Sequence, residues 1–271
     1  MASVREIALG NEILCGVVGS TSHGTAVDGQ DDRDEMGVFV EPPENVCGLE
    51  PCDHYIYRDQ PEGVRSQPGD LDLTMYSLRK FCRLAARGNP SVILLLWLPV
   101  HVRKTEIGAA LVRMREAFIS KESGERFLGY LVAQKLKLKG ERAHTVNRPE
   151  LVAKYGYDTK FAMHALRLGY EGIELMTQRR LTLPVAEPNL KTLRAVRTGK
   201  INFVDALALI DDAEMRLRVL VEGCPWTADV EGINQFMVWA HIEHWKLHHK
   251  WPNNRHIDPI LTGLAPAAAR T

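Results

Sequence analysis

The sequence predicts an α+β protein, in which a small mixed β-sheet with helices is followed by an all-helical C-terminal half. Four short strand-like segments lie within residues 12–76, separated by clusters of glycine, proline and aspartate. From Ser77 onward, apolar residues recur at helical spacing. The length of 271 residues suits one large domain or two modest ones. We place the boundary near residue 105, which divides the chain into 1–105 and 106–271.

The predicted elements follow in chain order. The strand segments are ILCGVV, EMGVFV, HYIYR and DLTMY. Ser77 is a suitable N-cap for the helix LRKFCRLAAR, which Gly88-Asn89-Pro90 ends. Further helices are expected over 91–97, 107–118, 124–139, 157–180, 190–198, 202–221 and 230–248.

The composition is that of an ordinary globular protein, with 45% hydrophobic and 25% charged residues. Because 34 basic and 34 acidic side chains cancel, bulk charge does not favour nucleic-acid binding, although a local basic face remains open. No apolar run approaches the ~20 residues that span a bilayer, and the N-terminus lacks a secretory signal pattern. We therefore expect a cytoplasmic protein that does not engage a membrane.

The cysteines fit neither a disulfide framework nor a zinc site. Their number, five, is odd. Cys47 and Cys52, with His54 close by, lack a fourth ligand and the usual Cys-x2-Cys spacing. Ordinary reduced cysteines are expected.

The strongest indication of chemistry is the segment GVVGSTSHGTAVDGQDDRDEMGVFV. An apolar strand runs into Gly19 and Ser20, where backbone N–H groups and the hydroxyl could bind a phosphate. About a dozen residues later, Asp32 and Asp34 enter the next strand on one face, because side chains alternate along a strand. Two carboxylates at this spacing suit a hard cation such as Mg²⁺. The competing interpretation is an acidic surface turn.

A third carboxylate is available in the run DLDLT at 70–74, where Asp70, Asp72 and Thr74 share one face. Either aspartate could complete the site. Three carboxylates fit a two-metal scheme, in which one ion activates the attacking oxygen and the other stabilises a triphosphate.

These residues resemble the signature of DNA polymerase β-type nucleotidyltransferases, a Gly-Ser turn followed by Asp-x-Asp and a distal aspartate. More narrowly, the chain resembles the RNA ligase-associated nucleotidyltransferases of phages and bacteria, through GSTSHGTAVDGQDDRDEMGVFV, DLTMYSLRKFCRLAARGNPSVILLLW and YGYDTKFAMHALRLGYEGIELM. The resemblance implies a nucleotidyltransferase head at 1–105 and Mg²⁺ or Mn²⁺ as cofactor. It also implies Asp72 as third metal ligand, with Asp70 as second choice. Asp31 departs from the pattern, which has serine there.

A second group of candidates lies on the helix predicted over 157–180. Polar residues at steps of three and four form one stripe, opposite an apolar stripe: Tyr157, Lys160, His164, Arg167, Glu171 and Glu174. Lys160, His164 and Arg167 are expected to face the cleft and hold the triphosphate or the acceptor. A solvated face is the competing interpretation. His23, in the glycine-serine turn, either contacts a phosphate or the acceptor or only caps the turn.

Two other patterns are more typical of surface and packing. Arg79, Arg83 and Arg87 share a helix face, which is expected to be solvated, with a track for acceptor phosphates as the alternative. A helix near the C-terminus carries histidines on one face, but without the His-Glu-x-x-His spacing of zinc proteases: His241, His244 and His248.

The predicted function is metal-dependent transfer of a nucleotidyl group from a nucleoside triphosphate to an acceptor hydroxyl, with release of pyrophosphate. Asp32, Asp34 and Asp72 are the expected catalytic metal ligands, and Asp72 is expected to help deprotonate the acceptor. RNA ends, a small molecule and a protein side chain all remain open as the acceptor. The alternatives are an antitoxin-like enzyme that adds AMP to a protein and a non-catalytic nucleotide-binding protein.

Overall fold

The computed structural model describes residues 2–27, 33–61, 67, 69–141 and 148–248. Within them, a five-stranded mixed sheet has the strand order β3-β4-β2-β1-β5. β2 and β4 are parallel, and the other neighbours are antiparallel. The strands are β1 (Glu12–Val17), β2 (Arg33–Phe39), β3 (His54–Arg58), β4 (Leu71–Ser77) and β5 (Arg103–Lys104). The predicted mixed sheet is confirmed, and the short β5 extends it.

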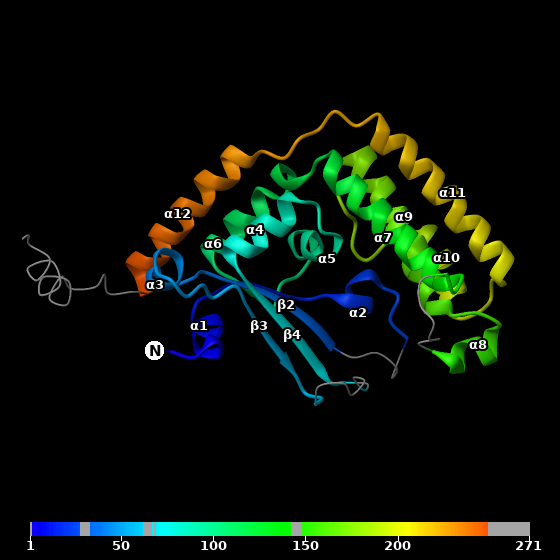
Figure 1. The fold of residues 1–271 in the computed structure, drawn as a ribbon, viewed down its shortest axis with the longest axis horizontal. Helices are drawn as coiled ribbons and strands as arrows, with labels where there is room; N and C mark the ends of the chain where they lie inside the picture. The colour runs from blue at the N-terminus through cyan, green and yellow to red at the C-terminus, as the bar shows by residue number, and fades with distance from the viewer. Residues whose placement is uncertain (1, 28–32, 62–66, 68, 142–147, 249–271) are drawn as a thin grey trace, which may run out of the picture.

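Helices pack against the sheet and then form the C-terminal half, and α1 lies on the face opposite the one that meets this half (Figure 1). The helices of the sheet half are α1 (Val4–Gly10), α2 (Gly19–His23), α3 (Pro43–Cys47), α4 (Leu78–Ala86), α5 (Pro90–Ile93), η1 (Leu94–Trp97), α6 (Glu106–Arg113) and η2 (Arg115–Phe118). Those of the C-terminal half are α7 (Lys121–Leu138), α8 (Pro149–Tyr155), α9 (Thr159–Gln178), α10 (Asn189–Arg197), α11 (Phe203–Glu222) and α12 (Val230–His248). The predicted all-helical half is confirmed.

Alternation along β2 decides which face of the sheet carries the site. Met36 and Val38 are buried in the main core, which the sheet shares with the helical half. Phe39 points to the opposite face, where it packs with Ala8 of α1. Because side chains alternate, Asp34 lies in step with Met36, on the face that meets the helical half.

The division near residue 105 stays a prediction. β5 ends at Lys104 and α6 begins at Glu106, so the change from strands to helices falls at this point. The buried side chains nevertheless form one main cluster, which includes Val38 of β2, Leu166 of α9 and Ile210 of α11.

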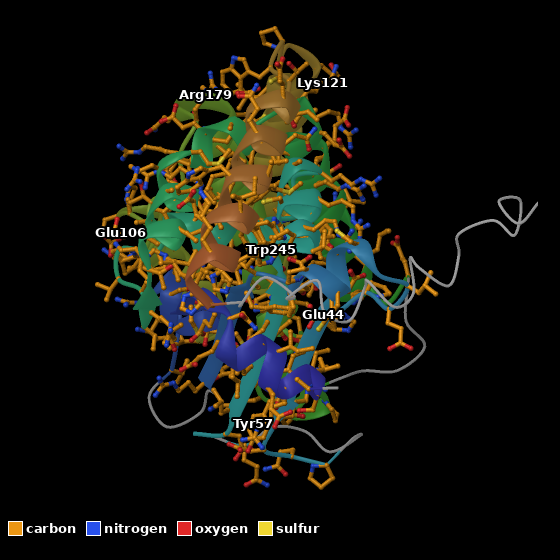
Figure 2. The ribbon with its side chains drawn as sticks, turned by 90° about the vertical axis from the view of Figure 1, so that its left-hand side faces the viewer. Glu44, Tyr57, Glu106, Lys121, Arg179 and Trp245 are labelled. Carbon is orange, nitrogen blue, oxygen red and sulfur yellow. The ribbon has the colours of Figure 1, made fainter. Side chains whose placement is uncertain are left out.

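α12 folds back over α4 and α6, and Trp245 lies near its end beside the sheet half (Figures 1 and 2). The Trp245 Nε1–H donates to the carbonyl oxygen of Glu41 at 2.7 Å. His241 Nε2 lies 3.2 Å from the Glu41 carboxylate, and His244 Nε2 lies 3.0 Å from the Asn11 side-chain oxygen. These contacts give the two histidines a packing role.

No helix in the described residues combines the length and the apolar character needed to cross a membrane.

Candidate active site

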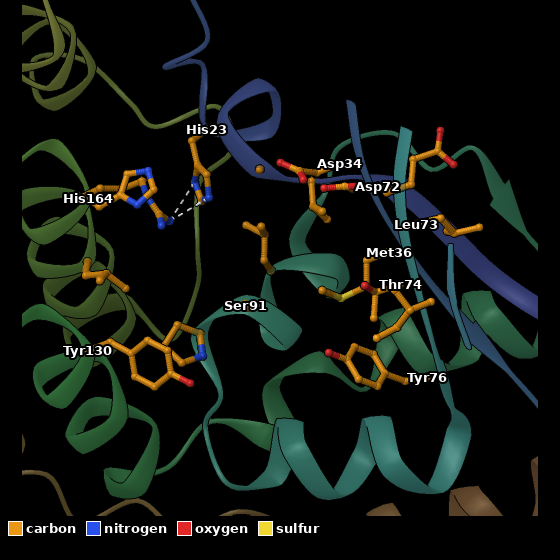
Figure 3. A pocket seen from close by; sticks show the side chains of 18 of the residues that line it. His23, Asp34, Met36, Asp72, Leu73, Thr74, Tyr76, Ser91, Tyr130 and His164 are labelled. Carbon is orange, nitrogen blue, oxygen red and sulfur yellow. Dashed lines mark hydrogen bonds between the residues drawn. The ribbon is translucent and has the colours of Figure 1, made fainter. Parts of the chain in front are cut away.

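A pocket of about 400 Å³ lies between the sheet and the helical half (Figure 3). β3 contributes to its lining, and its floor includes alternate residues of β2 and β4: Asp34, Met36, Asp72, Thr74 and Tyr76. α2, α5, α7 and α9 supply the walls. A smaller recess adjoins the pocket at α2 and α9 and brings in Ser20 and Lys160. Volumes of this order suit a small-molecule ligand.

Asp34 and Asp72 are direct neighbours on the parallel strands β2 and β4. Adjacent strands are about 4.8 Å apart, so side chains in register on one face come close together. Figure 3 shows the two carboxylates side by side at one end of the pocket. Their like charges repel, and a divalent cation between them would offset that repulsion.

Gly19 allows the chain to pass close to Asp34. Its φ of 70° lies in the left-handed region, and a Cβ atom at this position would overlap the Asp34 carboxylate. The Val18 N–H donates to the Asp34 carbonyl oxygen at 2.9 Å, which fixes the start of α2 against β2. The predicted glycine-serine turn is therefore the first turn of a short helix. Ser20 follows Gly19 on it and lines the recess.

The other acidic residues considered in the sequence analysis are Asp31, Asp32 and Asp70. Asp32 and Asp31 lie outside the described residues. Asp70 precedes β4, where its carboxylate accepts hydrogen bonds from the Gln60 side chain and the Gln67 N–H, and it does not line the pocket. Among the described residues, no group of three or more His, Cys, Asp or Glu side chains is placed to hold a metal ion. The geometry thus favours Asp72 over Asp70 as the partner of Asp34.

A buried hydrogen-bonded network joins α2 to α9. The Arg167 Nη1 lies 2.7 Å from His23 Nε2 and 2.8 Å from Glu171 Oε2, and His23 Nδ1 lies 2.7 Å from Glu171 Oε1. Arginine only donates, so His23 Nε2 accepts and the Nδ1–H donates to Glu171. This arrangement requires a neutral His23. His23 is therefore a link between α2 and α9, at the wall of the pocket.

The network keeps Glu171 charged and His23 neutral. Burial alone would raise the pKa of the Glu171 carboxyl, but the charge of Arg167 and hydrogen bonds from both partners hold this pKa at about 2. Burial lowers the pKa of His23, and the charge of Arg167 lowers it further. Arg167 retains its Nε and Nη2 donors, which form no hydrogen bond within the described part of the chain.

His164 and Lys160 also lie on the wall that α9 forms. His164 lines both the pocket and the recess, one helical turn before Arg167. Burial lowers its pKa well below the ordinary value, and the charges of Arg167 and Lys160 act in the same direction. The predicted group of Lys160, His164 and Arg167 is thus brought together opposite Asp34.

Glu171 is a residue that the sequence interpretation placed on the polar stripe but not in the site. It is 4% exposed, so the stripe is not a solvated face at this point. Its position four residues after Arg167 was the available signal, because a carboxylate at this spacing can pair with an arginine.

Tyr130 and Gln134 of α7 also line the pocket and were not predicted. Their spacing of four residues is equally typical of an exposed helix surface. Arg79, Arg83 and Arg87 do not line it. The first two lie 3.8 Å and 3.9 Å from carboxylate oxygens of Glu41 and Asp53.

The free energy of unfolding is expected to fall as the pH decreases below about 6.5, the ordinary pKa of histidine. The unfolded chain binds protons on His23 and His164 there, whereas the folded chain, with lowered pKa values, does not. His164→Gln should reduce the dependence of unfolding free energy on pH by up to about 1.4 kcal/mol per pH unit. Thermal melting between pH 7 and 5 measures this. The exposed His54→Gln is the control, and parallel curves for His164→Gln and wild type would contradict the assignment.

Comparisons with known proteins identify the family of the chain. The family model described as "RNA repair pathway DNA polymerase beta family" matches residues 10–208, a span that includes both carboxylates and α9 and ends before α12. A search of curated proteins gives no significant match. Among solved structures, a nucleotidyltransferase-like protein from Exiguobacterium sibiricum is similar at 10% identity and a TM-score of 0.29, covering 89% of this chain and 74% of that chain.

Proposed function

Because the chain belongs to the RNA repair pathway DNA polymerase β family, we propose that it transfers a nucleotidyl group from a nucleoside triphosphate to an acceptor hydroxyl. One observation supports this most strongly. Asp34 and Asp72 pair in register at one end of a pocket, and Arg167 of α9 faces them, with Lys160 in the adjoining recess. Anionic and cationic groups thus flank the same space, as a metal-bound triphosphate requires.

The carboxylates fit a divalent cation by the chemistry of their donors. Carboxylate oxygens are the ligands that Mg²⁺ and Mn²⁺ prefer in proteins. Asp34 and Asp72 would hold the ion, and we propose Asp32 as the third ligand from its place two residues before Asp34. When bound, Mg²⁺ or Mn²⁺ would neutralise charge on the triphosphate and make the acceptor hydroxyl more acidic.

In the proposed reaction, the acceptor oxygen forms a bond with the α-phosphorus. The bond from that phosphorus to the oxygen bridging the α- and β-phosphates breaks, and pyrophosphate leaves with the bridging oxygen. The acceptor proton passes to Asp72, whose carboxylate lies at this end of the pocket.

The residues of α2 and α9 would position the leaving group. Ser20 and Lys160 line the recess beside Asp34, where they can donate hydrogen bonds to phosphate oxygens. Arg167 would offer its Nε and Nη2 donors, while its Nη1 stays bound to His23 and Glu171. His23 is thus a positioning residue in this proposal, since it holds Arg167 in place.

We propose RNA as the acceptor, following the RNA repair named in the family description. A groove beside the 25–27 loop supports this choice. Besides Glu187, its charged lining residues are basic side chains of α10 and the residues after it: Lys191, Arg194, Arg197 and Lys200. Lys191, Arg197 and Lys200 form no ion pair within the described ranges. Thr25 lines both this groove and the recess, so a phosphate chain in the groove would lead to the pocket.

The fate of an α-labelled nucleotide tests this function. The protein would be incubated with each labelled triphosphate, Mg²⁺ or Mn²⁺, and either RNA or a cell extract. Label in RNA is the expected result. Label in protein would favour the antitoxin-like alternative, and no transfer to any acceptor would favour a nucleotide-binding protein without catalysis.

Lys191→Glu combined with Lys200→Glu is expected to weaken RNA binding at least tenfold. Each lysine that contacts a phosphate also contributes to the salt dependence of affinity. Loss of two contacts should therefore reduce the slope of log affinity against log salt by about 1.4 for single-stranded RNA. Fluorescence titration at several salt concentrations measures both quantities.

The matched control is Lys104→Glu combined with Lys246→Glu, an equal charge change on β5 and α12. α12 lies at the opposite end of the molecule from α10 (Figure 1). This variant should retain affinity. Equal weakening in both variants would mean that only net charge matters and that the groove does not bind RNA.

A further inference from the structure

The pocket extends well beyond the carboxylates, and its far end differs in character. Figure 3 shows Tyr130 and Tyr76 on opposite sides of this end, away from Asp34 and Asp72. Apolar side chains such as Leu94 and Leu168 also line the pocket. One end of the pocket therefore carries charged groups and the other carries two aromatic rings.

This polarity matches a nucleoside triphosphate, which has an anionic chain at one end and a flat aromatic base at the other. Tyr130 is 40% exposed although it stands on the pocket wall, so its ring is available for stacking. Tyr76 is half-buried on the floor. Burial raises the pKa of the Tyr76 hydroxyl, and the nearby Tyr130 hydroxyl adds to this effect.

Gln134 supplies a polar group at the same end. It lies one turn after Tyr130 on α7 and lines the pocket. Its side-chain oxygen is buried and accepts no hydrogen bond within the described part of the chain. Buried acceptors are almost always satisfied, so an orphan at a pocket wall indicates a donor that a ligand brings.

We propose that Tyr130, Tyr76 and Gln134 form a nucleobase subsite, in which Gln134 selects a base that carries an amino group at C6 of a purine or C4 of a pyrimidine. This inference rests on the proposed function, because it places the triphosphate at Asp34 and Asp72. Adenine and cytosine present an amino group, which can donate to the Gln134 oxygen. Guanine and uracil present a carbonyl oxygen at the equivalent position and leave that acceptor unsatisfied.

The test is equilibrium binding of ATP, CTP, GTP, UTP and inorganic tripolyphosphate to the full chain with Mg²⁺. Wild type should bind ATP or CTP at least about tenfold more tightly than GTP and UTP. Gln134→Met should lose this preference, whereas Gln134→Glu, which keeps an acceptor, should retain it. Tyr130→Leu should weaken nucleotide binding about tenfold and leave tripolyphosphate binding unchanged.

Gln235→Met on the exposed side of α12 is the control and should behave like wild type. Thermal melting of each variant shows that it is folded. If tripolyphosphate and all four nucleotides bind Gln134→Met and Tyr130→Leu as they bind wild type, the subsite is wrong and the proposed function stands. A wild-type preference for GTP or UTP also overturns the subsite. If neither tripolyphosphate nor any nucleotide binds, both proposals fail.

Discussion

Asp34→Asn and Asp72→Asn are each expected to reduce nucleotidyl transfer by a factor on the order of a thousand. Each change removes one negative charge from the pair that lies in register on β2 and β4. Asparagine has nearly the same volume, and both positions are only half-buried, so the fold should be retained. Turnover, measured with melting temperature and divalent-ion affinity, separates loss of chemistry from loss of structure.

Asp70→Asn is the matched control, because it makes the same chemical change two residues from Asp72. The Asp70 carboxylate accepts hydrogen bonds from Gln60 and Gln67 and does not line the pocket. Its replacement should leave turnover within a fewfold of wild type. A larger loss for Asp70→Asn than for Asp72→Asn would mean that Asp70, and not Asp72, binds the metal ion with Asp34.

Glu171→Leu is expected to reduce the free energy of unfolding by about 3–5 kcal/mol. It leaves Arg167 and the His23 Nδ1–H without their acceptor in a buried environment. A change of this size should lower the melting temperature by roughly 10 °C. The same variant should lower nucleotide affinity, because Arg167 loses the partner that fixes its position.

A second variant separates the buried charge from simple loss of packing. Arg167→Met combined with Glu171→Leu removes both charges, so it should be more stable than Glu171→Leu alone. Glu125→Leu, at an exposed position on α7, should change stability by about 0.5 kcal/mol or less. If Glu171→Leu melts like Glu125→Leu, the network does not stabilise the fold.

Much of the fold could be predicted because its elements carry strong local signals. The four longer strands coincide with alternating or apolar runs, and Ser77 caps α4 as expected by accepting a hydrogen bond from the Lys80 N–H. The two-residue β5 was not predicted, because so short a segment has no measurable periodicity. α8 and α1 were also missed, since seven residues cover barely two helical turns.

The site was predicted less completely, because it depends on how separate elements pack together. Alternation placed Asp34 on one face of its strand, but only the parallel pairing of β2 with β4 brings Asp72 beside it. Spacing on α9 identified Lys160, His164 and Arg167 as one group. It did not show that Glu171 is buried, because burial depends on α2 and on the helices packed around α9. Gln134 had no sequence signal of its own.

The central claim is tested most directly by counting two products in one reaction, pyrophosphate and transferred α-label. The reaction contains RNA, a labelled nucleoside triphosphate and Mg²⁺, with wild type and Asp34→Asn compared side by side. We expect one pyrophosphate for each label transferred by wild type, and neither product from Asp34→Asn. Release of phosphate without label transfer, or undiminished transfer by Asp34→Asn, would contradict nucleotidyl transfer at this pocket.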